Sequence, residues 1–207
     1  AEIKNSESSK VEFISQEKLI EKIVIPKIGT VMLRGESGVG KTTLIDQLIG
    51  ISFLDNYSIK KSEYFKMEEI FFVPQAISIS SGTYKDNLKL LLNKIPEDEE
   101  IKSVFANLRI KHLFERLILN DEKIGSSIEF SGISGGELKR IFLSFCLLSK
   151  RKIFILDEIF SGIDSNSSEI ICDIFNAIKK EKLILIVAHE KFKNIEVDFE
   201  YTLRRKN

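Results

Sequence analysis

One glycine-rich stretch constrains this chain more than any other part of its sequence. The apolar run Val31–Leu33 leads into a loop, and apolar residues at helical spacing follow the loop from Leu44 to Ile49. The loop consists of Gly35, Glu36, Ser37, Gly38, Val39, Gly40, Lys41, Thr42 and Thr43. Its glycines let the backbone turn tightly and aim N–H groups at phosphate oxygens, and the N-terminus of the next helix favours an anion. The stretch therefore predicts a phosphate-binding loop between a strand and a helix.

Two side chains of this loop suit a nucleotide in particular. Lys41 can reach the β and γ phosphates as a point charge, and the Thr42 hydroxyl can serve as a ligand of Mg²⁺. The alternative is a glycine-rich turn that matches the pattern by chance. The strand before the loop and the amphipathic helix after it favour the nucleotide site.

The composition bounds the fold and the partners. The chain has 207 residues, 43% of them hydrophobic, which is enough for one large core or one core with a subdomain. Its 31 basic residues balance 31 acidic ones, so we expect no nucleic-acid partner. No apolar run reaches the roughly 18 residues that a membrane helix needs, and the start shows no signal-peptide pattern. Cys146 and Cys172 are expected to be buried free thiols.

A pair of acids follows a second apolar run. Ile153–Leu156 is typical of a buried parallel strand, and Asp157 and Glu158 come directly after it. Ligands of open α/β sheets bind at this end of the strands. We therefore expect Asp157 to hold Mg²⁺, directly or through water, and Glu158 to take a proton from an attacking water. In isolation, two solvated acids after a strand would be the simpler interpretation.

Two further strands are each followed by one polar side chain of interest. Ile70–Val73 is a compact apolar run with Gln75 beyond its end, and Leu183–Ala188 is an apolar strand followed at once by His189. A histidine at a strand end beside the other site residues can donate a hydrogen bond to a γ-phosphate. We therefore expect His189 at the nucleotide site.

A second anion-ready helix start lies in the same chain. Ser134, Gly135, Gly136 and Glu137 precede the apolar segment Leu138–Leu148, which predicts a capped helix N-terminus. By itself this pattern is more often a simple helix cap or turn. One phosphate loop does not need a second such feature.

The remaining segments predict the surrounding elements. Short strands are expected at Val11–Ile14 and Lys22–Ile28, a turn-rich segment at Ile51–Lys61, and a strand or turn around Tyr201. Helical periodicity predicts a mostly helical insertion with helices at Tyr84–Leu92, Ile101–Leu108 and Leu113–Leu119, with His112 as a surface helix residue, and a later helix from about Ser168 to Lys179.

Taken in order, these motifs resemble the nucleotide-binding domains of the ABC transporter ATPases. The resemblance implies that Gly35–Thr43 is the Walker A loop, Ile133–Glu137 the signature and Ile153–Glu158 the Walker B strand. It also implies that Gln75 is the Q-loop residue, with a role in catalysis and as a metal ligand, that Ser161–Asp164 is the D-loop, and that His189 is the switch histidine. Asp164 is then part of the nucleotide site.

The chain departs from the family pattern at a few positions. Ile133 and Glu137 replace the usual Leu and Gln of the signature, and Phe145 stands where the following helix often carries Arg. The aromatic residue that stacks on adenine has no clear counterpart, and Phe13, the nearest candidate, could equally be a core residue. The spacing from Gln75 through Gly82-Thr83 to Asn87 resembles the exporters of the family.

The expected fold is a single α/β domain over residues 1–207. It has a P-loop core with a mostly parallel sheet, a small N-terminal antiparallel sheet and an inserted helical subdomain. The catalytic lobe is expected at about 1–78 and 140–207, and the helical subdomain at about 79–139.

The resemblance implies hydrolysis of ATP with Mg²⁺, coupled to transport and, in its exporter-like features, to export, at the cytoplasmic face of a membrane. Two such domains close head to tail, each ATP lying between the Walker A loop of one and the signature of the other, and transmembrane domains respond. One alternative is an ABC-type ATPase of DNA repair or the ribosome, whose usual coiled coils or second cassette are missing from this sequence. Another is a hydrolysis-deficient regulatory subunit, against which Glu158 and His189 argue.

Overall fold

A parallel sheet forms the centre of the molecule. The computed structural model describes residues 11–15, 23–51, 57–60, 65–77, 79–92, 94–124 and 133–204, with the backbone alone for 11–15 and 57–60. The sheet has five strands, all paired in parallel, in the order β10-β3-β9-β8-β5. Their bounds are β3 (Gly29–Gly35), β5 (Ile70–Val73), β8 (Ile153–Asp157), β9 (Leu183–Ala188) and β10 (Phe199–Leu203). Its strands end at one edge, where the sequence predicts the site.

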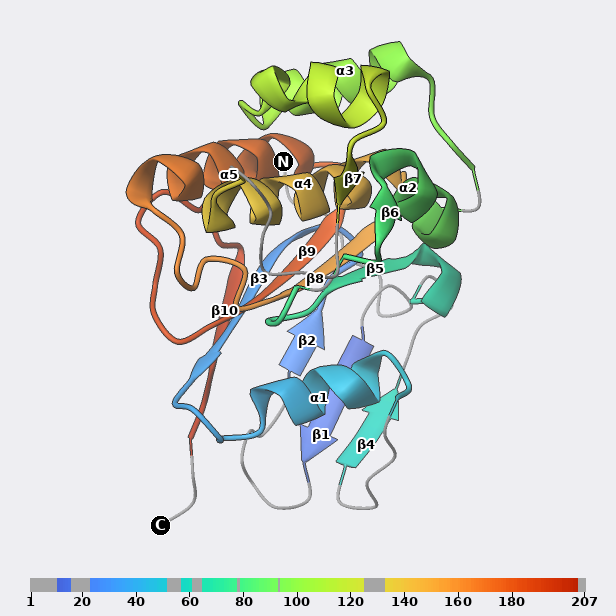
Figure 1. Cartoon of the computed structure of the whole chain (residues 1–207). Helices are drawn as coiled ribbons and strands as arrows, with labels where there is room; N and C mark the ends of the chain where they lie inside the picture. The colour runs from blue at the N-terminus through green and yellow to red at the C-terminus, as the bar shows by residue number, and fades with distance from the viewer. Residues whose placement is uncertain are drawn as a thin grey trace.

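A small antiparallel sheet lies beside α1 (Lys41–Leu48), as Figure 1 shows. Its order is β2-β1-β4, with β1 (Val11–Ser15), β2 (Ile23–Ile25) and β4 (Tyr57–Lys60). The predicted N-terminal antiparallel sheet is confirmed, with two corrections. The strand expected over Lys22–Ile28 is confined to β2. The segment expected to be turn-rich contains β4, because β1 offers its free edge to the alternating sequence Tyr57-Ser-Ile-Lys60.

Helices cover both faces of the parallel sheet. α1 packs on one face, and α4 (Gly135–Leu148) and α5 (Ser165–Ile178) lie over the other (Figure 1). Strand alternation divides the core accordingly: Phe154 and Leu156 of β8 pack toward the α4 and α5 side, and Ile153 and Ile155 belong to the cluster that contains α1. The predicted P-loop α/β architecture is therefore confirmed.

The insertion is helical but less regular than its sequence predicts. It follows η2 (Met67–Glu69) and β5, and contains α2 (Tyr84–Leu92), α3 (Asp98–Asn107), the 3-10 turn η3 (Lys111–Leu113) and the π-helical turn η4 (Glu115–Leu119). The single helix expected over Leu113–Leu119 is thus divided into η3 and η4. A short antiparallel pair of β6 (Gly82–Thr83) and β7 (Lys123–Ile124), which periodicity could not predict, ties the two sides of the insertion together. The bounds 79–139 stay a prediction, and α4 runs across the second of them.

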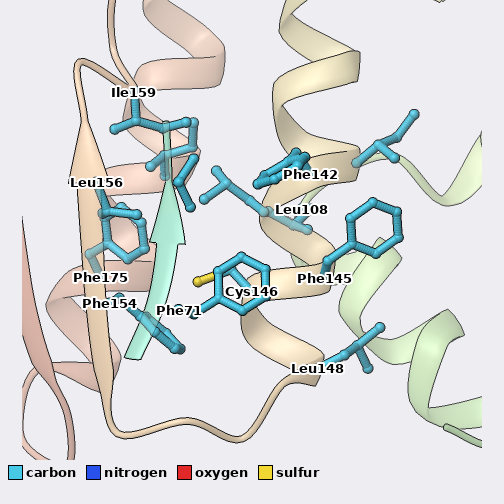
Figure 2. Close-up of a cluster of buried hydrophobic side chains, with 14 of the residues drawn as sticks. Phe71, Leu108, Phe142, Phe145, Cys146, Leu148, Phe154, Leu156, Ile159 and Phe175 are labelled. Carbon is cyan, nitrogen blue, oxygen red and sulfur yellow. The ribbon is translucent and has the colours of Figure 1, made fainter. Parts of the chain in front are cut away.

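Phe145 is a core residue of the α4 face. Its buried ring lies 4.8 Å from that of Tyr84 and 5.9 Å from that of Phe142, measured between centroids. Figure 2 shows it among the buried side chains of this cluster. The residue that replaces the arginine of the family pattern therefore packs α4 against α2.

Cys146 and Cys172 are buried and free, as expected. Among the described residues, no helix combines the length and apolarity needed to cross a membrane.

Candidate functional site

The phosphate loop joins β3 to α1 through left-handed glycines. Gly38 and Gly40 have φ of 71° and 98°, a region that side chains with a Cβ rarely adopt. A Cβ on Gly35 would lie 2.8 Å from both the Leu203 carbonyl oxygen and a Val39 methyl. Gly40 is the N-cap of α1 and has no side chain to cap the helix. The backbone N–H groups of the first turn are therefore available to an anion.

Lys41 is held at the loop by backbone carbonyls. Its side chain is almost buried, and Nζ donates hydrogen bonds to the carbonyl oxygens of Gly35 at 2.7 Å and Glu36 at 3.0 Å. The same ammonium lies 3.7 Å from Glu158 Oε1 and 3.3 Å from His189 Nδ1. The positive charge thus lies at the meeting point of the loop, β8 and β9.

Glu158 directly follows β8 and is 8% exposed. Its φ of 51° is unusual for a residue with a side chain, and its N–H donates to the Val187 carbonyl at 2.9 Å. Oε1 lies 2.7 Å from His189 Nε2. A backbone strained in this way often marks a functional position. The strand end therefore fixes the carboxylate between two cationic or donor groups.

His189 bridges the carboxylate and the loop. While Nε2 faces Glu158, Nδ1 lies 3.2 Å from the Gly35 carbonyl oxygen. One ring nitrogen therefore faces the carboxylate and the other faces the loop. The structure thus brings together Lys41, Glu158 and His189, which the sequence predicts from three separate motifs.

The side chains of Asp157 and Thr42 supply neighbouring oxygen atoms that suit a hard cation. Thr42 Oγ1 donates to Asp157 Oδ2 at 3.1 Å, whereas the buried Oδ1 has no hydrogen-bond partner among the described residues. Burial raises the pKa of Asp157, and the Thr42 hydrogen bond opposes that rise. Mg²⁺ is typically held by one or two carboxylates with phosphate oxygens and water, so the orphaned oxygen and the hydroxyl fit it. In the described part of the chain, no group of three or more His, Cys, Asp or Glu residues could hold a metal unaided.

Gln75 lies just beyond β5, next to β8 in the sheet, and its side chain is exposed. Within the part of the chain that the structure describes, it makes no hydrogen bond to Thr42 or Asp157. Its role toward the metal stays a prediction.

Phe13, the candidate for stacking on adenine, lies in β1 opposite Ile23 and Ile59. Its side chain lies outside the described part of the structure.

The second predicted anion site is built on two adjoining helix starts. Ser134 caps α4 in a reciprocal capping box with Glu137, and Asp164 caps α5 by accepting from the Ser167 N–H at 2.9 Å. A Cβ on Gly136 would meet Asp164 Oδ2 at 3.2 Å. The structure therefore brings Ser134, Gly136 and Asp164 together. Among the described residues, no hydrogen bond or ion pair joins Ser134–Glu137 to the phosphate loop.

His112 is an exposed helical residue, as predicted, and lies in the 3-10 turn η3. Its contact with the signature was not predicted: Nε2 lies 2.6 Å from Glu137 Oε1. The only signal in the sequence is the acid at a position where the family has Gln. Nothing local to either residue predicts the contact, because 25 positions separate them.

A cavity of about 510 Å³ opens beside the phosphate loop. It is lined by Arg34, Gly35, Glu36, Val39 and His189 together with the end of β10. Its volume is within the range of small-molecule sites. A smaller cavity of about 200 Å³ adjoins it at Glu158, His189 and Phe192.

Comparison with known proteins agrees with this geometry. A family model described as ABC transporter matches residues 22–161, which is more than half of the chain. The chain belongs to the ABC transporter family. The segment matched in this ABC protein includes the phosphate loop together with Ile133–Glu137 and Ile153–Glu158. The family expected from the sequence is therefore confirmed.

The relatives of this ABC domain include export proteins. It is 32% identical over 167 residues to an export ATP-binding/permease protein of Rickettsia bellii, covering 75% of this chain and 28% of that protein. It is 29% identical over 169 residues to the glutathione/L-cysteine transport system ATP-binding/permease protein CydC of Escherichia coli, covering 77% and 28%. The chain thus spans little more than a quarter of the length of these relatives.

A solved structure shares the fold. A bacterial Atm1-family ABC exporter with ATP bound superimposes with a TM-score of 0.76 at 18% sequence identity, covering 99% of this chain and 39% of the other. At this identity the likeness supports the fold, which the sequence had predicted from its ordered motifs.

Proposed function

We propose that this domain hydrolyses ATP at the phosphate loop and drives export through transmembrane domains, from the cytoplasmic face of a membrane. The observation that carries the proposal is the convergence of Lys41, Glu158 and His189 at the loop, with Glu158 Oε1 2.7 Å from His189 Nε2 and 3.7 Å from Lys41 Nζ. This carboxylate is buried and held in a fixed position at the loop, unlike a solvated acid, which supports its assignment as the general base.

Each residue has a distinct part in this chemistry. Lys41 exchanges its bonds to the loop carbonyls for the β and γ phosphate oxygens, and the glycine loop binds the phosphates through its N–H groups. Glu158 accepts a proton from the attacking water. His189 orients that carboxylate and then donates toward the γ-phosphate.

Mg²⁺ would be held by Thr42 and Asp157, with Gln75 as a further ligand. When bound, the cation neutralises charge on the phosphate oxygens. Asp157 Oδ1, which has no hydrogen-bond partner among the described residues, supports this assignment, because a buried carboxylate oxygen without a donor is costly unless a ligand engages it.

The second anion site gives the reason for a dimer. Ser134, Gly135, Gly136, Glu137 and Asp164 form a surface with capped helix starts, yet one nucleotide at the loop does not use it. We assign this surface to the nucleotide on a second ABC domain, identical or different. ATP-dependent closure then moves the transmembrane domains, and hydrolysis reopens the pair.

The purified chain provides the first test. Phosphate release from ATP should require Mg²⁺ and should be lost in Lys41→Ala, while Lys27→Ala, an exposed lysine at the opposite end of β3, should match the unchanged protein. Equal rates with EDTA and with Mg²⁺, or a fully active Lys41→Ala, would contradict the proposal.

A further inference from the structure

We propose that His112 is a positioning residue for the signature carboxylate of Glu137, holding Oε1 of that carboxylate on its own chain where the second domain's nucleotide docks. This inference rests on the proposed shared site. It concerns the one signature residue whose charge differs from the Gln of the family pattern, and a partner that lies in the helical insertion.

Both oxygens of the Glu137 carboxylate are engaged within the chain. Oε2 accepts hydrogen bonds from the Ser134 N–H and the Ser134 hydroxyl, both at 2.8 Å, and Oε1 meets His112 Nε2 at 2.6 Å. The side chain is 16% exposed. Without His112, Oε1 of Glu137 would lack this contact within the signature segment.

Glu137 is ionised at neutral pH. Burial raises the pKa of Glu137, but the hydrogen bonds from Ser134 and the contact with His112 outweigh burial and hold that pKa below its ordinary value. An anion in the first turn stabilises its own helix. The same charge repels the phosphates that the N-terminus of α4 would otherwise attract, so a compensating donor is needed there.

His112 is placed for this task by the insertion. Its turn η3 is anchored by the buried Leu113, while the imidazole itself is 59% exposed and reaches across to α4. Among the described residues, Arg116 of η4 is bonded to Glu122 and also interacts electrostatically with Glu137, and Lys111, next to His112 in the chain, is exposed. Of the described side chains, only His112 and Ser134 bond the Glu137 carboxylate directly.

The contact therefore connects the helical insertion to the signature. A movement of η3 relative to α4 would release Oε1 and place an uncompensated charge in the docking surface. His112 acts through Glu137 and does not itself contact the nucleotide.

A double-mutant cycle on steady-state ATP hydrolysis tests this inference. His112→Ala should raise the KM for ATP by about two- to fivefold, the range expected for the loss of one exposed hydrogen bond to the carboxylate, with a smaller change in kcat. Whatever Glu137→Gln does alone, adding His112→Ala to it should change KM no further, because the carboxylate that needs compensation is gone. Lys111→Ala, which removes a neighbouring positive charge without that contact, should behave as the unchanged protein.

Thermal denaturation of each variant separates positioning from folding. A His112→Ala protein with an unchanged KM overturns the inference. An equal rise in KM on adding His112→Ala to the unchanged protein and to Glu137→Gln also overturns it, because that result would indicate a structural role. Failure of the proposed function looks different, because the unchanged protein itself would then show no hydrolysis of ATP.

Discussion

At the residue scale, the chemistry of this domain depends on one carboxylate. Glu158 has a positive φ, is nearly buried and is bonded to His189, whereas its neighbour Asp157 faces Thr42 and keeps one oxygen unpartnered among the described residues. Two adjacent acids thus receive different environments. The first suits proton transfer and the second suits a metal ligand.

Glu158→Gln should separate binding from hydrolysis. The amide keeps the shape of the side chain but cannot accept the proton, so we expect turnover to fall on the order of 100-fold or more. Nucleotide should still bind, and an ATP-dependent dimer should accumulate. Steady-state phosphate release, nucleotide titration and size-exclusion chromatography with ATP measure these effects.

Glu68→Gln is a matched control, since Glu68 is an exposed acid of η2. It should leave all three measurements unchanged. An unaltered rate in Glu158→Gln would rule out this residue as the base.

At the scale of elements, α4 connects the parts of the domain. Its N-terminus carries the signature, Lys139 donates to the carbonyls of Ile159 and Ser161 just beyond Glu158, and Ser144 and Phe145 pack against Tyr84 of α2. The helix therefore contacts both the insertion and the residues that follow β8.

The buried hydroxyl pair of Tyr84 and Ser144 joins α2 to α4. Its oxygens lie 2.6 Å apart, and the Ser144 hydroxyl also donates to the Ile141 carbonyl, so Tyr84 is the donor to Ser144. Burial raises the pKa of Tyr84, which keeps the phenol neutral. Tyr84→Phe removes this bond while Ser144 keeps its own, and we expect a loss of about 1 kcal/mol in the free energy of unfolding.

Denaturant unfolding of Tyr84→Phe, Ser144→Ala and the double variant checks this value. The double variant should lose less than the sum of the single losses, because both remove the same bond. Strict additivity would show that the hydroxyls do not interact in solution.

At the scale of the whole molecule, the phosphate loop and the signature are two anion-binding surfaces of one chain. Lys41→Ala disables the first, and Ser134→Arg blocks the second with a bulky group. Each variant should be nearly inactive alone. In a mixed dimer, one site combines the intact loop of one variant with the intact signature of the other, so mixing should restore activity up to about one working site per mixed dimer.

The mixture is assayed for phosphate release over a range of ratios, after crosslinking with ATP has shown that mixed dimers form. A site contained within one chain gives no recovery at any ratio. If mixed dimers are present and the rate stays at the sum of the two variants, the shared site is wrong.

The sequence by itself determined the phosphate loop, the apolar strands with Asp157, Glu158 and His189 at their ends, and the capped start of α4. These features are local, because a glycine turn, a strand and an amphipathic helix can each be predicted from a short run of consecutive residues. The order of the motifs then sufficed for the fold and the family.

The tertiary structure decided which of these side chains meet. His189 reaches Glu158 because β9 pairs with β8. The strand β4 forms because it pairs with the edge of β1, and Phe145 is buried because it packs against Tyr84. The contact between His112 and Glu137 likewise joins η3 to α4. Such contacts form only when the free energy gained by packing and strand pairing offsets the entropy lost in closing the intervening chain. A local sequence pattern does not reveal whether this condition is met.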